Sequence, residues 1–440
     1  MKSIYSRFKE LDREKKILYI FVATMFATMM GWIIQQFIRV VILDYHFFNG
    51  TTWSPVEHDY WMDFFNVNYW TQKDFNPYTT SFRSSYPPLI LAISRVVSFM
   101  TDYSGGAVAG RDSILGTLSY HLVFCGCMAI SFASWIKCMR EKGLSFKTRI
   151  CVGIALMCAA PNLYLYGRGN YLIIVVACIS VFIAWYNSEK RWQRELSLIL
   201  LAIAAGIKLY PALLAAILLK ERRFADFFKT VVYTIAAFFL PFLVFSGGFS
   251  NIAVFLENLT SFQGSGQVSD SNYSVPTFLY YLVQFTKGFQ GGAVPQWVIT
   301  VGAKISTVML LAALFLSLFS KNSWKALALV TIGLIVYPAP SYVYTATMLL
   351  PIIVLFLICE NKTKIDYVYM ALFLMVMIPI QLGYVIAPGH FGTGISFNNF
   401  MQLIAMMAIY CLIAYDSTVN LIHICKDKLN SRKKEKSLNT

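Results

Sequence analysis

Charged side chains are scarce in this sequence. Asp, Glu, Lys and Arg together make up 13% of its 440 residues, which is about half the share that is usual in a soluble domain. Hydrophobic residues make up 57%, more than a soluble core can bury, because a soluble surface must be largely polar. This scarcity of charge excludes an ordinary soluble domain and predicts an all-α polytopic protein whose helices lie in a lipid bilayer.

The sequence also lacks the short motifs that mark common catalytic centres. It contains no Walker-type phosphate loop, no dinucleotide-binding glycine fingerprint, no HExxH pair and no paired CxxC. The nine cysteines lie in apolar runs or basic loops, where they imply neither a disulfide framework nor a metal site. We therefore expect no metal and no other cofactor. The net charge of +15 comes from short clusters between apolar runs, so we expect no nucleic-acid partner.

Apolar runs recur along the chain and predict a bundle of about 12 transmembrane helices. The runs are 17–43, 114–136, 149–165, 171–187, 195–208, 211–219, 226–246, 296–319, 324–338, 343–359, 366–385 and 399–424. Two of them, 195–208 and 211–219, are too short to cross alone and are separated at Lys208-Leu-Tyr-Pro211. Proline breaks helices, and a broken helix is tolerated in a membrane where protein covers its backbone. We expect these two runs to form a hairpin that enters the bilayer and returns.

Basic residues predict the orientation of the helices. They cluster in the N-terminal segment and in 137–149, 190–194, 220–229, 321–325, 362–364 and 426–436, all on one side of the helix scheme. Cytoplasmic loops carry an excess of Lys and Arg. The sequence therefore predicts a multi-pass protein of the cell membrane with both termini in the cytoplasm.

The same scheme predicts a single integral membrane domain over 1–426, followed by a basic cytoplasmic tail, 427–440, that we expect to be disordered. Two long segments, 44–113 and 247–295, fall on the outer side as loops. The first contains a short apolar stretch, 86–101, with Arg95 inside it. This stretch is short for a crossing and predicts an interfacial or re-entrant helix.

Two acids in the first outer loop are candidates for chemistry. Asp59 and Asp63 are four residues apart and share one face if the stretch is helical. A carboxylate at the membrane boundary can act as a general base when an acceptor hydroxyl is within hydrogen-bond reach. The alternative is that both are solvated acids on an interfacial helix. His58 could hydrogen-bond to either carboxylate or have a structural role.

Cationic side chains also occur near membrane depth. Arg168 lies with Asn170 between two apolar runs, Lys208 lies at the broken hairpin, and Lys304 lies inside 296–319. Ionisable residues in a bilayer are costly and are functional candidates for that reason. A cation at such a place could hold a phosphate. Lys304 could instead extend to the interface, whereas the neighbours of Lys208 are all apolar.

Several short motifs occur in a characteristic order. They are Asp59-Tyr60, Asn76-Pro77-Tyr78, Tyr86-Pro87-Pro88, Gly167-Arg-Gly-Asn170, Lys208-Leu-Tyr-Pro211, Lys220-Glu-Arg-Arg223, Asn272-Tyr-Ser274 and Tyr337-Pro338. In this order the sequence resembles glycosyltransferase family 87, the polyprenol-phosphate-mannose-dependent alpha-mannosyltransferases of the C-type (GT-C) fold. Two stretches depart from the family pattern: Arg168 stands where the family usually has Gln, and Tyr342-Val-Tyr344 stands near a stretch that often contains His.

The resemblance implies a GT-C-type bundle with an extracytoplasmic first loop and active site. It implies transfer of a mannose-like hexose from a polyprenyl-phosphate sugar to a hydroxyl of a glycolipid or glycan. Asp59 best matches the family's catalytic base, with Asp63 in reserve, and one base without a covalent intermediate implies inversion. The expected phosphate-binding cations are Lys208, Arg168 and Arg83. The expected substrate contacts are His58, Asn76, Tyr78, Tyr86, Asn170 and Asn272.

Three other functions remain open from the residues alone. Broken helices and buried charges also suit a lipid or sugar transporter or flippase, although no inverted repeat is visible. An envelope oligosaccharide polymerase or ligase is a second alternative, although its large outer loop tends to lie in the C-terminal half. A non-catalytic membrane scaffold is the third, and it would leave Asp59 and Asp63 freely replaceable.

Overall fold

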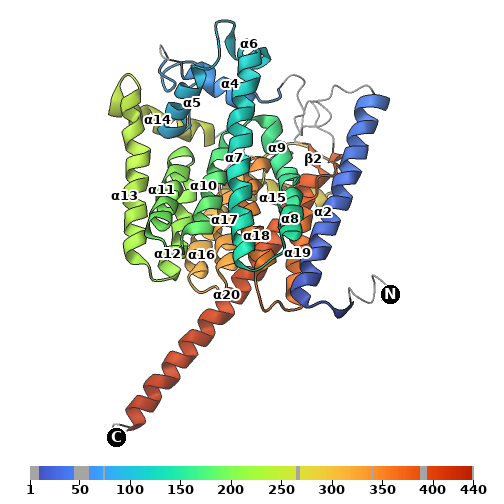
Figure 1. The fold of residues 1–440 in the computed structure, drawn as a ribbon, viewed down its shortest axis with the longest axis vertical. Helices are drawn as coiled ribbons and strands as arrows, with labels where there is room; N and C mark the ends of the chain where they lie inside the picture. The colour runs from blue at the N-terminus through green and yellow to red at the C-terminus, as the bar shows by residue number, and fades with distance from the viewer. Residues whose placement is uncertain are drawn as a thin grey trace.

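The computed structural model describes residues 9–43, 59–72, 75–263, 268–338, 340–386 and 394–438, which form an α-helical bundle with one short β-ribbon (Figure 1). In the first half the elements are α2 (Arg13–Phe37), the π-helical turn η1 (Ile38–Ile42), α4 (Met62–Trp70), α5 (Pro88–Ser98), α6 (Gly106–Asp112), α7 (Ile114–Glu141), α8 (Phe146–Met157), α9 (Ala160–Arg168), α10 (Leu172–Trp185), α11 (Arg191–Ile207), η2 (Tyr210–Ala215) and α12 (Ala216–Lys220). In the second half they are α13 (Phe224–Phe239), η3 (Leu240–Val244), η4 (Gly248–Ser250), α14 (Asn251–Gln263), α15 (Val275–Thr286), α16 (Gln296–Ser317), α17 (Ser323–Val336), η5 (Val343–Leu349), α18 (Leu350–Ile358), α19 (Ile365–Met377), β1 (Tyr384–Ile386), β2 (Ile395–Ser396) and α20 (Phe397–Leu438).

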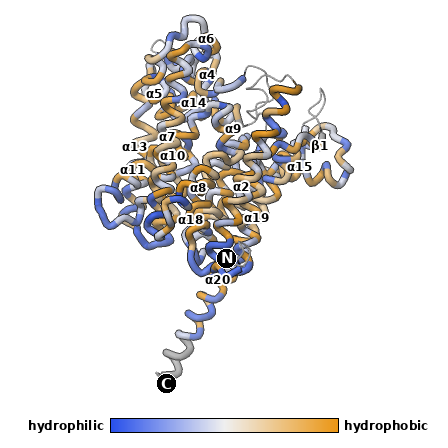
Figure 2. Tube along the Cα trace, turned by 45° about the vertical axis from the view of Figure 1, so that its right-hand side comes forward, coloured by the Kyte–Doolittle hydropathy of each residue, from blue (hydrophilic) through white to orange (hydrophobic). Residues whose placement is uncertain are grey.

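Long apolar helices confirm the predicted all-α polytopic membrane fold. Within the described residues, five segments are long and apolar enough to cross a bilayer: Arg13–Ile42, Ile114–Glu141, Phe224–Val244, Gln296–Ser317 and Phe397–Ser431. A sixth crossing is possible if α8 and α9, which are bent by 53° at their junction, act as one span. The remaining apolar helices are shorter, so the count of about 12 crossings stays a prediction. Figure 2 shows hydrophobic residues along the helices and hydrophilic loops at the end near the N-terminus.

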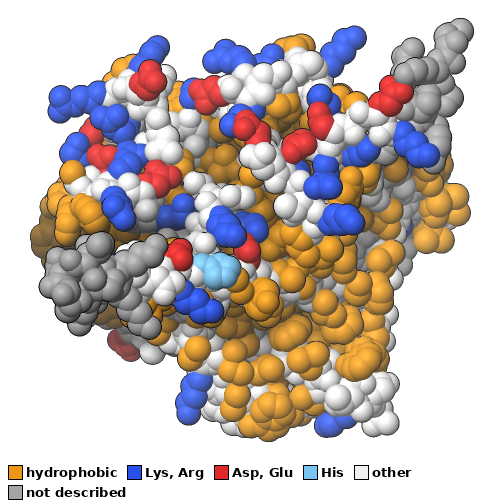
Figure 3. All heavy atoms as spheres, turned by 90° about the horizontal axis from the view of Figure 1, so that it is seen from below, with side chains coloured by type: hydrophobic (Ala, Val, Ile, Leu, Met, Phe, Trp, Pro, Cys, Tyr) orange, Lys and Arg blue, Asp and Glu red, His pale blue; other side chains and the backbone are white. Residues whose placement is uncertain are grey.

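The two ends of the bundle differ. Both termini lie at one end, while α4, α5, α6 and α14 gather at the other (Figure 1). Figure 3 views the end with the termini, and Lys and Arg side chains are spread over much of it. Described Lys and Arg side chains therefore gather at the end of the bundle that carries the termini. Its assignment to the cytoplasm remains a prediction from the charge pattern.

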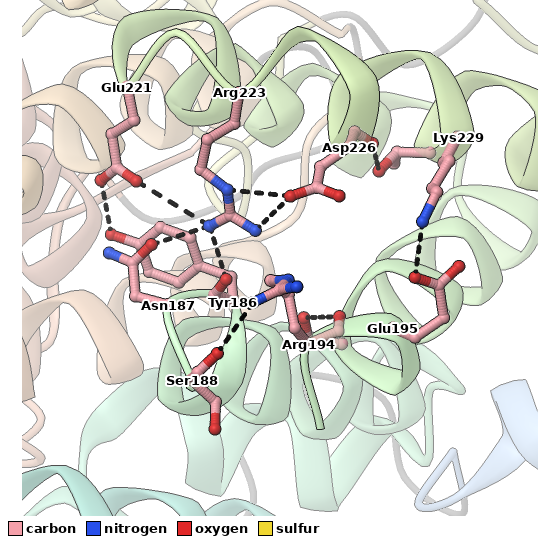
Figure 4. Close-up of polar contacts among 11 residues, drawn as sticks. Tyr186, Asn187, Ser188, Arg194, Glu195, Glu221, Arg223, Asp226 and Lys229 are labelled. Carbon is pink, nitrogen blue, oxygen red and sulfur yellow. Dashed lines mark hydrogen bonds and ion pairs between the residues drawn. The ribbon is translucent and has the colours of Figure 1, made fainter. Parts of the chain in front are cut away.

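The expected hairpin is formed by α11, η2 and α12, and Lys208 lies at its turn. Lys208 has an extended backbone, with φ −140° and ψ 120°, directly after α11 ends. The open base of the hairpin is held by polar contacts (Figure 4). There, Arg223 donates to the Tyr186 carbonyl at 2.5 Å, and Lys229 pairs with Glu195 at 2.9 Å. The start of α11 and the end of α12 therefore lie at the same end of the bundle. Lys208, at the turn between them, lies inside the bundle.

The short apolar stretch of the first outer loop forms the short amphipathic helix α5, and its interfacial or re-entrant position in the membrane stays a prediction. Pro88 occupies its first turn, where a missing N–H costs nothing. The Arg95 guanidinium donates to the carbonyls of Thr71 (2.9 Å), Phe75 (2.8 Å) and Val244 (2.9 Å). A cation that interrupts an apolar stretch therefore ties the α4–α5 connection and η3 to α5.

Two expectations about helix ends are wrong. The run 366–385 is helical only to Met377, because Pro379 forces the residue before it into an extended conformation. The chain then pairs β1 with β2. The tail 427–440, expected to be disordered, continues α20 as far as Leu438. It contains neither Gly nor Pro and has four Lys and one Arg, which are good helix formers, so nothing in it stops the helix.

Candidate active site

A contact between two backbone segments builds the site. α9 ends at Arg168, and Gly169 follows it with a left-handed φ of 68°. The Trp61 N–H donates to the Gly167 carbonyl at 2.7 Å. A Cβ on Gly169 would lie 2.7 Å from the Trp61 Cα, closer than real side chains approach. Glycine is therefore required at 169 by both its backbone angle and its neighbour, and it fixes the end of α9 against the start of α4.

This contact brings one arginine to both candidate acids. Arg168 forms ion pairs with Asp59 and with Asp63, the latter at 2.7 Å. Asn170 completes the group by donating to the other Asp63 oxygen at 2.8 Å. Helix α4 begins at Met62, so Asp59 precedes it. The two carboxylates are therefore joined through Arg168 and not by sharing a helical face. We call Asp59, Asp63, Arg168 and Asn170 the carboxylate cluster.

The two acids of the cluster differ in their surroundings. The Asp59 side chain is 27% exposed and that of Asp63 is 17% exposed. Burial raises the pKa of Asp59 above its ordinary value; Arg168 opposes this effect and the negative charge of Asp63 adds to it. Asp59 is thus the more accessible of the two acids. Both oxygens of Asp63 accept hydrogen bonds. We therefore expect Asp63 to hold the cluster in place.

Lys208 lies at the hairpin turn with its ammonium 5.2 Å from the centre of the Tyr86 ring. It interacts electrostatically with Asp63, yet it forms no hydrogen bond or ion pair with any residue that the structure describes. The Tyr86 side chain in turn interacts with Asn170. A half-buried cation without a counter-ion is costly, and an anionic ligand would remove that cost.

Aromatic side chains form another wall of the site. Asn170 donates to the Tyr344 hydroxyl at 3.2 Å, and the Tyr344 ring stacks on Tyr164 and Tyr342 with centroids 5.9 and 5.6 Å away. Neither Tyr344 nor Tyr164 is among the predicted site residues. The departure of Tyr342-Val-Tyr344 from the family pattern was the one sequence signal that could have identified this wall.

Other predicted substrate contacts hold the scaffold. Asn76 donates to the Asn251 side-chain oxygen at 2.9 Å and ties the first outer loop to the second. Tyr78 is buried, with its hydroxyl donating to the Tyr86 carbonyl at 3.3 Å. Asn272 is fully buried in an isolated antiparallel bridge to Tyr342. These three residues therefore join chain segments next to the site and do not reach the carboxylate cluster in any contact described above.

Arg83 and His58 complete the predicted set. Arg83 is exposed on a turn, with a left-handed φ of 42°. Among the described residues no interaction joins its side chain to the carboxylate cluster. His58 lies outside the described residues.

A surface groove of about 390 Å³ lies beside the cluster, lined by Asp112, Ser113, Ile114, Thr117, Leu118 and His121. Its polar side chains connect to the residues around Asp59. Arg111 pairs with Asp112 at 2.7 Å and covers the Tyr60 ring at 4.2 Å. The His121 ring packs edge-on against Trp61 at 4.9 Å. The groove therefore lies along α7, next to residues that contact the start of α4.

The described residues combine a carboxylate of raised pKa, an ammonium with no counter-ion and a wall of tyrosines at one end of a helical membrane bundle. No three His, Cys, Asp or Glu side chains gather as a metal site within the part of the chain that the structure describes. A base and a cation next to aromatic faces suit group transfer from an anionic, ring-shaped donor. The fold and site thus define a membrane-embedded transferase.

Comparison with known families specifies this class. Residues 85–338, more than half of the chain, match the sequence profile of glycosyltransferase family 87, and the chain belongs to that family. It is therefore a membrane glycosyltransferase, which rules out the non-catalytic scaffold and a purely transporting protein. The match includes Tyr86, Arg168, Asn170 and Lys208 and begins after Asp59 and Asp63. A search of curated protein sequences finds no match to this chain.

Proposed function

We propose that this glycosyltransferase moves a mannose-like hexose from a polyprenyl-phosphate sugar to a hydroxyl of a glycolipid or glycan at the extracytoplasmic face. The observation that carries the proposal is the pairing of a carboxylate cluster with the uncompensated Lys208 across the site. Lys208 interacts with Asp63 of this cluster only electrostatically, with no hydrogen bond or ion pair to any described residue. The donor phosphate brings the anion that Lys208 lacks among its described neighbours.

In the proposed reaction Asp59 accepts the proton of the acceptor hydroxyl. The acceptor oxygen forms a bond to the anomeric carbon from the side opposite the donor phosphate. The bond between that carbon and the phosphate oxygen breaks, and the polyprenyl phosphate leaves with the electron pair. A single displacement of this kind inverts the anomeric carbon. A base positioned in this way typically contributes about 10²- to 10⁴-fold to the rate.

Lys208 has the second role in this proposal. The phosphate gains negative charge as the sugar leaves, and a fixed cation in a low-dielectric site stabilises that charge more than water does. Arg168, expected beside the phosphate, is engaged by both acids, so we assign it to holding Asp59 and Asp63 in place. Arg83 and His58 are not needed for this scheme. The groove along α7 is the path we propose for the acceptor hydroxyl.

The decisive experiment is a transfer assay with purified protein in proteoliposomes. A polyprenyl-phosphate mannose carrying radiolabel in the sugar is supplied with a membrane glycolipid fraction. We expect label in the glycolipid, with inverted anomeric configuration. Transfer from a nucleotide sugar but not from the lipid phosphate would refute the proposed donor. Transfer of a preassembled oligosaccharide would favour the polymerase or ligase alternative.

A further inference from the structure

An apolar groove of about 580 Å³ lies on the outside of the bundle, along the arm of the hairpin that follows Lys208. Ala216 and Leu219 of α12 form one wall, Phe227 and Thr230 of α13 a second, and Leu314 of α16 the third. The groove is of ligand size. Its rim is apolar, since side chains such as Phe315 are 54% exposed. In a bilayer such a surface groove is filled by a hydrocarbon chain.

Three cations follow the ends of the groove-lining helices. Lys220 comes directly after Leu219, Arg222 lies two residues further on, and Lys321 lies three residues after the groove residue Leu318. Arg222 and Lys321 are exposed, and Lys220 is partly exposed. None of the three side chains forms a hydrogen bond or ion pair with a residue that the structure describes.

Neighbouring acids do not neutralise these cations because they already have other partners (Figure 4). Glu221 accepts from the Tyr186 hydroxyl at 3.0 Å, and Asp226 pairs with Arg223 at 2.5 Å. Glu195 is paired with Lys229. The base of the hairpin thus pairs its own acids internally and leaves the three cations at the ends of the groove-lining helices without an acidic partner among the described residues.

The backbone of Arg222 adds an independent observation. The Arg223 N–H donates to the Leu218 carbonyl at 2.8 Å and the Arg222 N–H to the Leu219 carbonyl at 3.0 Å. These bonds end α12 with a turn that usually places glycine in the left-handed position. Arg222 occupies that position with φ 58°, which is unfavourable for a residue with a Cβ. Strain of this kind points to a function for the side chain.

We propose that the groove and these three cations bind one anionic phospholipid, with an acyl chain between α13 and α16 and the phosphate at Lys220, Arg222 and Lys321. The bound lipid packs against η2 and α12, the arm that begins just after Lys208. Occupancy therefore stabilises the hairpin. The predicted orientation places this site in the cytoplasmic leaflet, where anionic lipids attract basic residues. The site is separate from the proposed sugar transfer.

The test uses the full-length protein in mixed micelles, with phosphatidylglycerol or phosphatidylcholine of identical acyl chains as the probe. Native mass spectrometry measures bound lipid, and thermal unfolding measures stability. We expect phosphatidylglycerol to bind more tightly and to raise the melting temperature. Removing the charges in Lys220→Gln/Lys321→Gln should weaken its binding by about fivefold per cation. Equal binding of the two lipids to the wild-type protein would overturn the proposal.

Two variants separate the lipid site from folding and from general surface charge. Arg222→Gly replaces the strained residue by the one that the turn prefers, so it should fold at least as stably as the wild type without lipid, yet bind phosphatidylglycerol more weakly. Lys190→Gln/Arg191→Gln removes two charges from the neighbouring α10–α11 connection and should keep wild-type binding. Unchanged binding in Arg222→Gly, or an equal loss in the control, would refute the site. Displacement of phosphatidylglycerol from the wild type by a much lower concentration of polyprenyl phosphate than of competing phosphatidylglycerol would instead assign the groove to the sugar donor.

Discussion

Asn170 donates to Asp63 at 2.8 Å and to the Tyr344 hydroxyl at 3.2 Å. This one amide therefore joins the first outer loop to the segment after α17, two parts of the chain far apart in sequence. Asp63 also pairs with Arg168, which in turn pairs with Asp59. The positions of Asp59, Arg168 and Tyr344 therefore depend on one another. A change at one of them should be felt at the others, and the effects of single variants should not simply add.

Asp59→Asn should abolish most of the transfer activity while leaving the protein folded. The amide keeps the size of the carboxylate but cannot accept the acceptor's proton, so we expect a rate lower by about 10²- to 10⁴-fold. The melting temperature at neutral pH should stay the same or rise, because burial disfavours the charged form of Asp59. Initial rates with labelled donor and thermal unfolding in the same detergent measure both quantities.

Asp63→Asn is the matched comparison for the base assignment. Asp63 is bonded on both oxygens, and breaking a partly buried ion pair costs stability. We therefore expect a lower melting temperature as well as lower activity. If Asp59→Asn transfers sugar at the wild-type rate and Asp63→Asn does not, the base assignment passes from Asp59 to Asp63.

Lys208→Gln should lower the rate of sugar transfer by a factor on the order of 10²–10³, because the departing phosphate loses its cation in a site of low dielectric. Lys208→Arg should keep part of the activity. Lys304→Gln is the control, since Lys304 is exposed on α16 and should be replaceable. Steady-state kinetics with varied donor will show the loss. A wild-type rate in Lys208→Gln would remove Lys208 from the reaction.

Gly169→Ala should destabilise the protein and reduce activity together. The left-handed backbone alone costs about 1–2 kcal/mol with a Cβ, and the added atom would also press against the Trp61 backbone. Gly126→Ala is the control, because a Cβ at that exposed position in α7 meets nothing within 4 Å. Alanine there should leave the melting temperature unchanged or raise it. Equal melting temperatures for the two variants would show that the close contact of Gly169 with Trp61 is unimportant.

Local signals in the sequence were enough for part of this structure. Lys208 and Pro211 interrupt an apolar run, and the hairpin turn lies where they predict it. The stretch around Arg95 was too short to cross a bilayer, and it is the short helix α5. In the run 366–385, apolar composition concealed the effect of Pro379, so the end of α19 was missed. Helix positions follow from composition more reliably than helix ends do.

The geometry of the site depends on contacts that no local pattern contains. Asp59 and Asp63 would share a face only in a continuous helix, whereas Arg168 joins them because Gly169 fits against Trp61. Tyr344 reaches Asn170 because its segment pairs with the chain around Asn272. Both arrangements join segments more than 60 residues apart in sequence. Sequence patterns could nominate these residues but could not show which of them contact the acids and which support the scaffold.

The pH dependence of transfer should reveal the environment of Asp59. Burial raises the pKa of this carboxyl above the 3.8 of an ordinary Asp. The base form exists only above that pKa, so kcat/KM for the acceptor should fall as the pH decreases through a midpoint higher than 3.8. Folding favours the protonated form, so the stability that this group contributes is present below 3.8 and is lost as the pH rises through the folded pKa. Activity and stability should therefore change in opposite directions over this interval.

Arg168→Gln tests the cause of this shift. The positive charge of Arg168 opposes the effect of burial on Asp59, so its removal should raise the pKa of Asp59 further and move the acid limb of kcat/KM to higher pH. The residual activity of the variant, followed with labelled donor across the acidic range, gives the midpoint. A midpoint that stays where it is in the wild type would mean that the titrating group is not in contact with Arg168, and Asp59 could then not be the base.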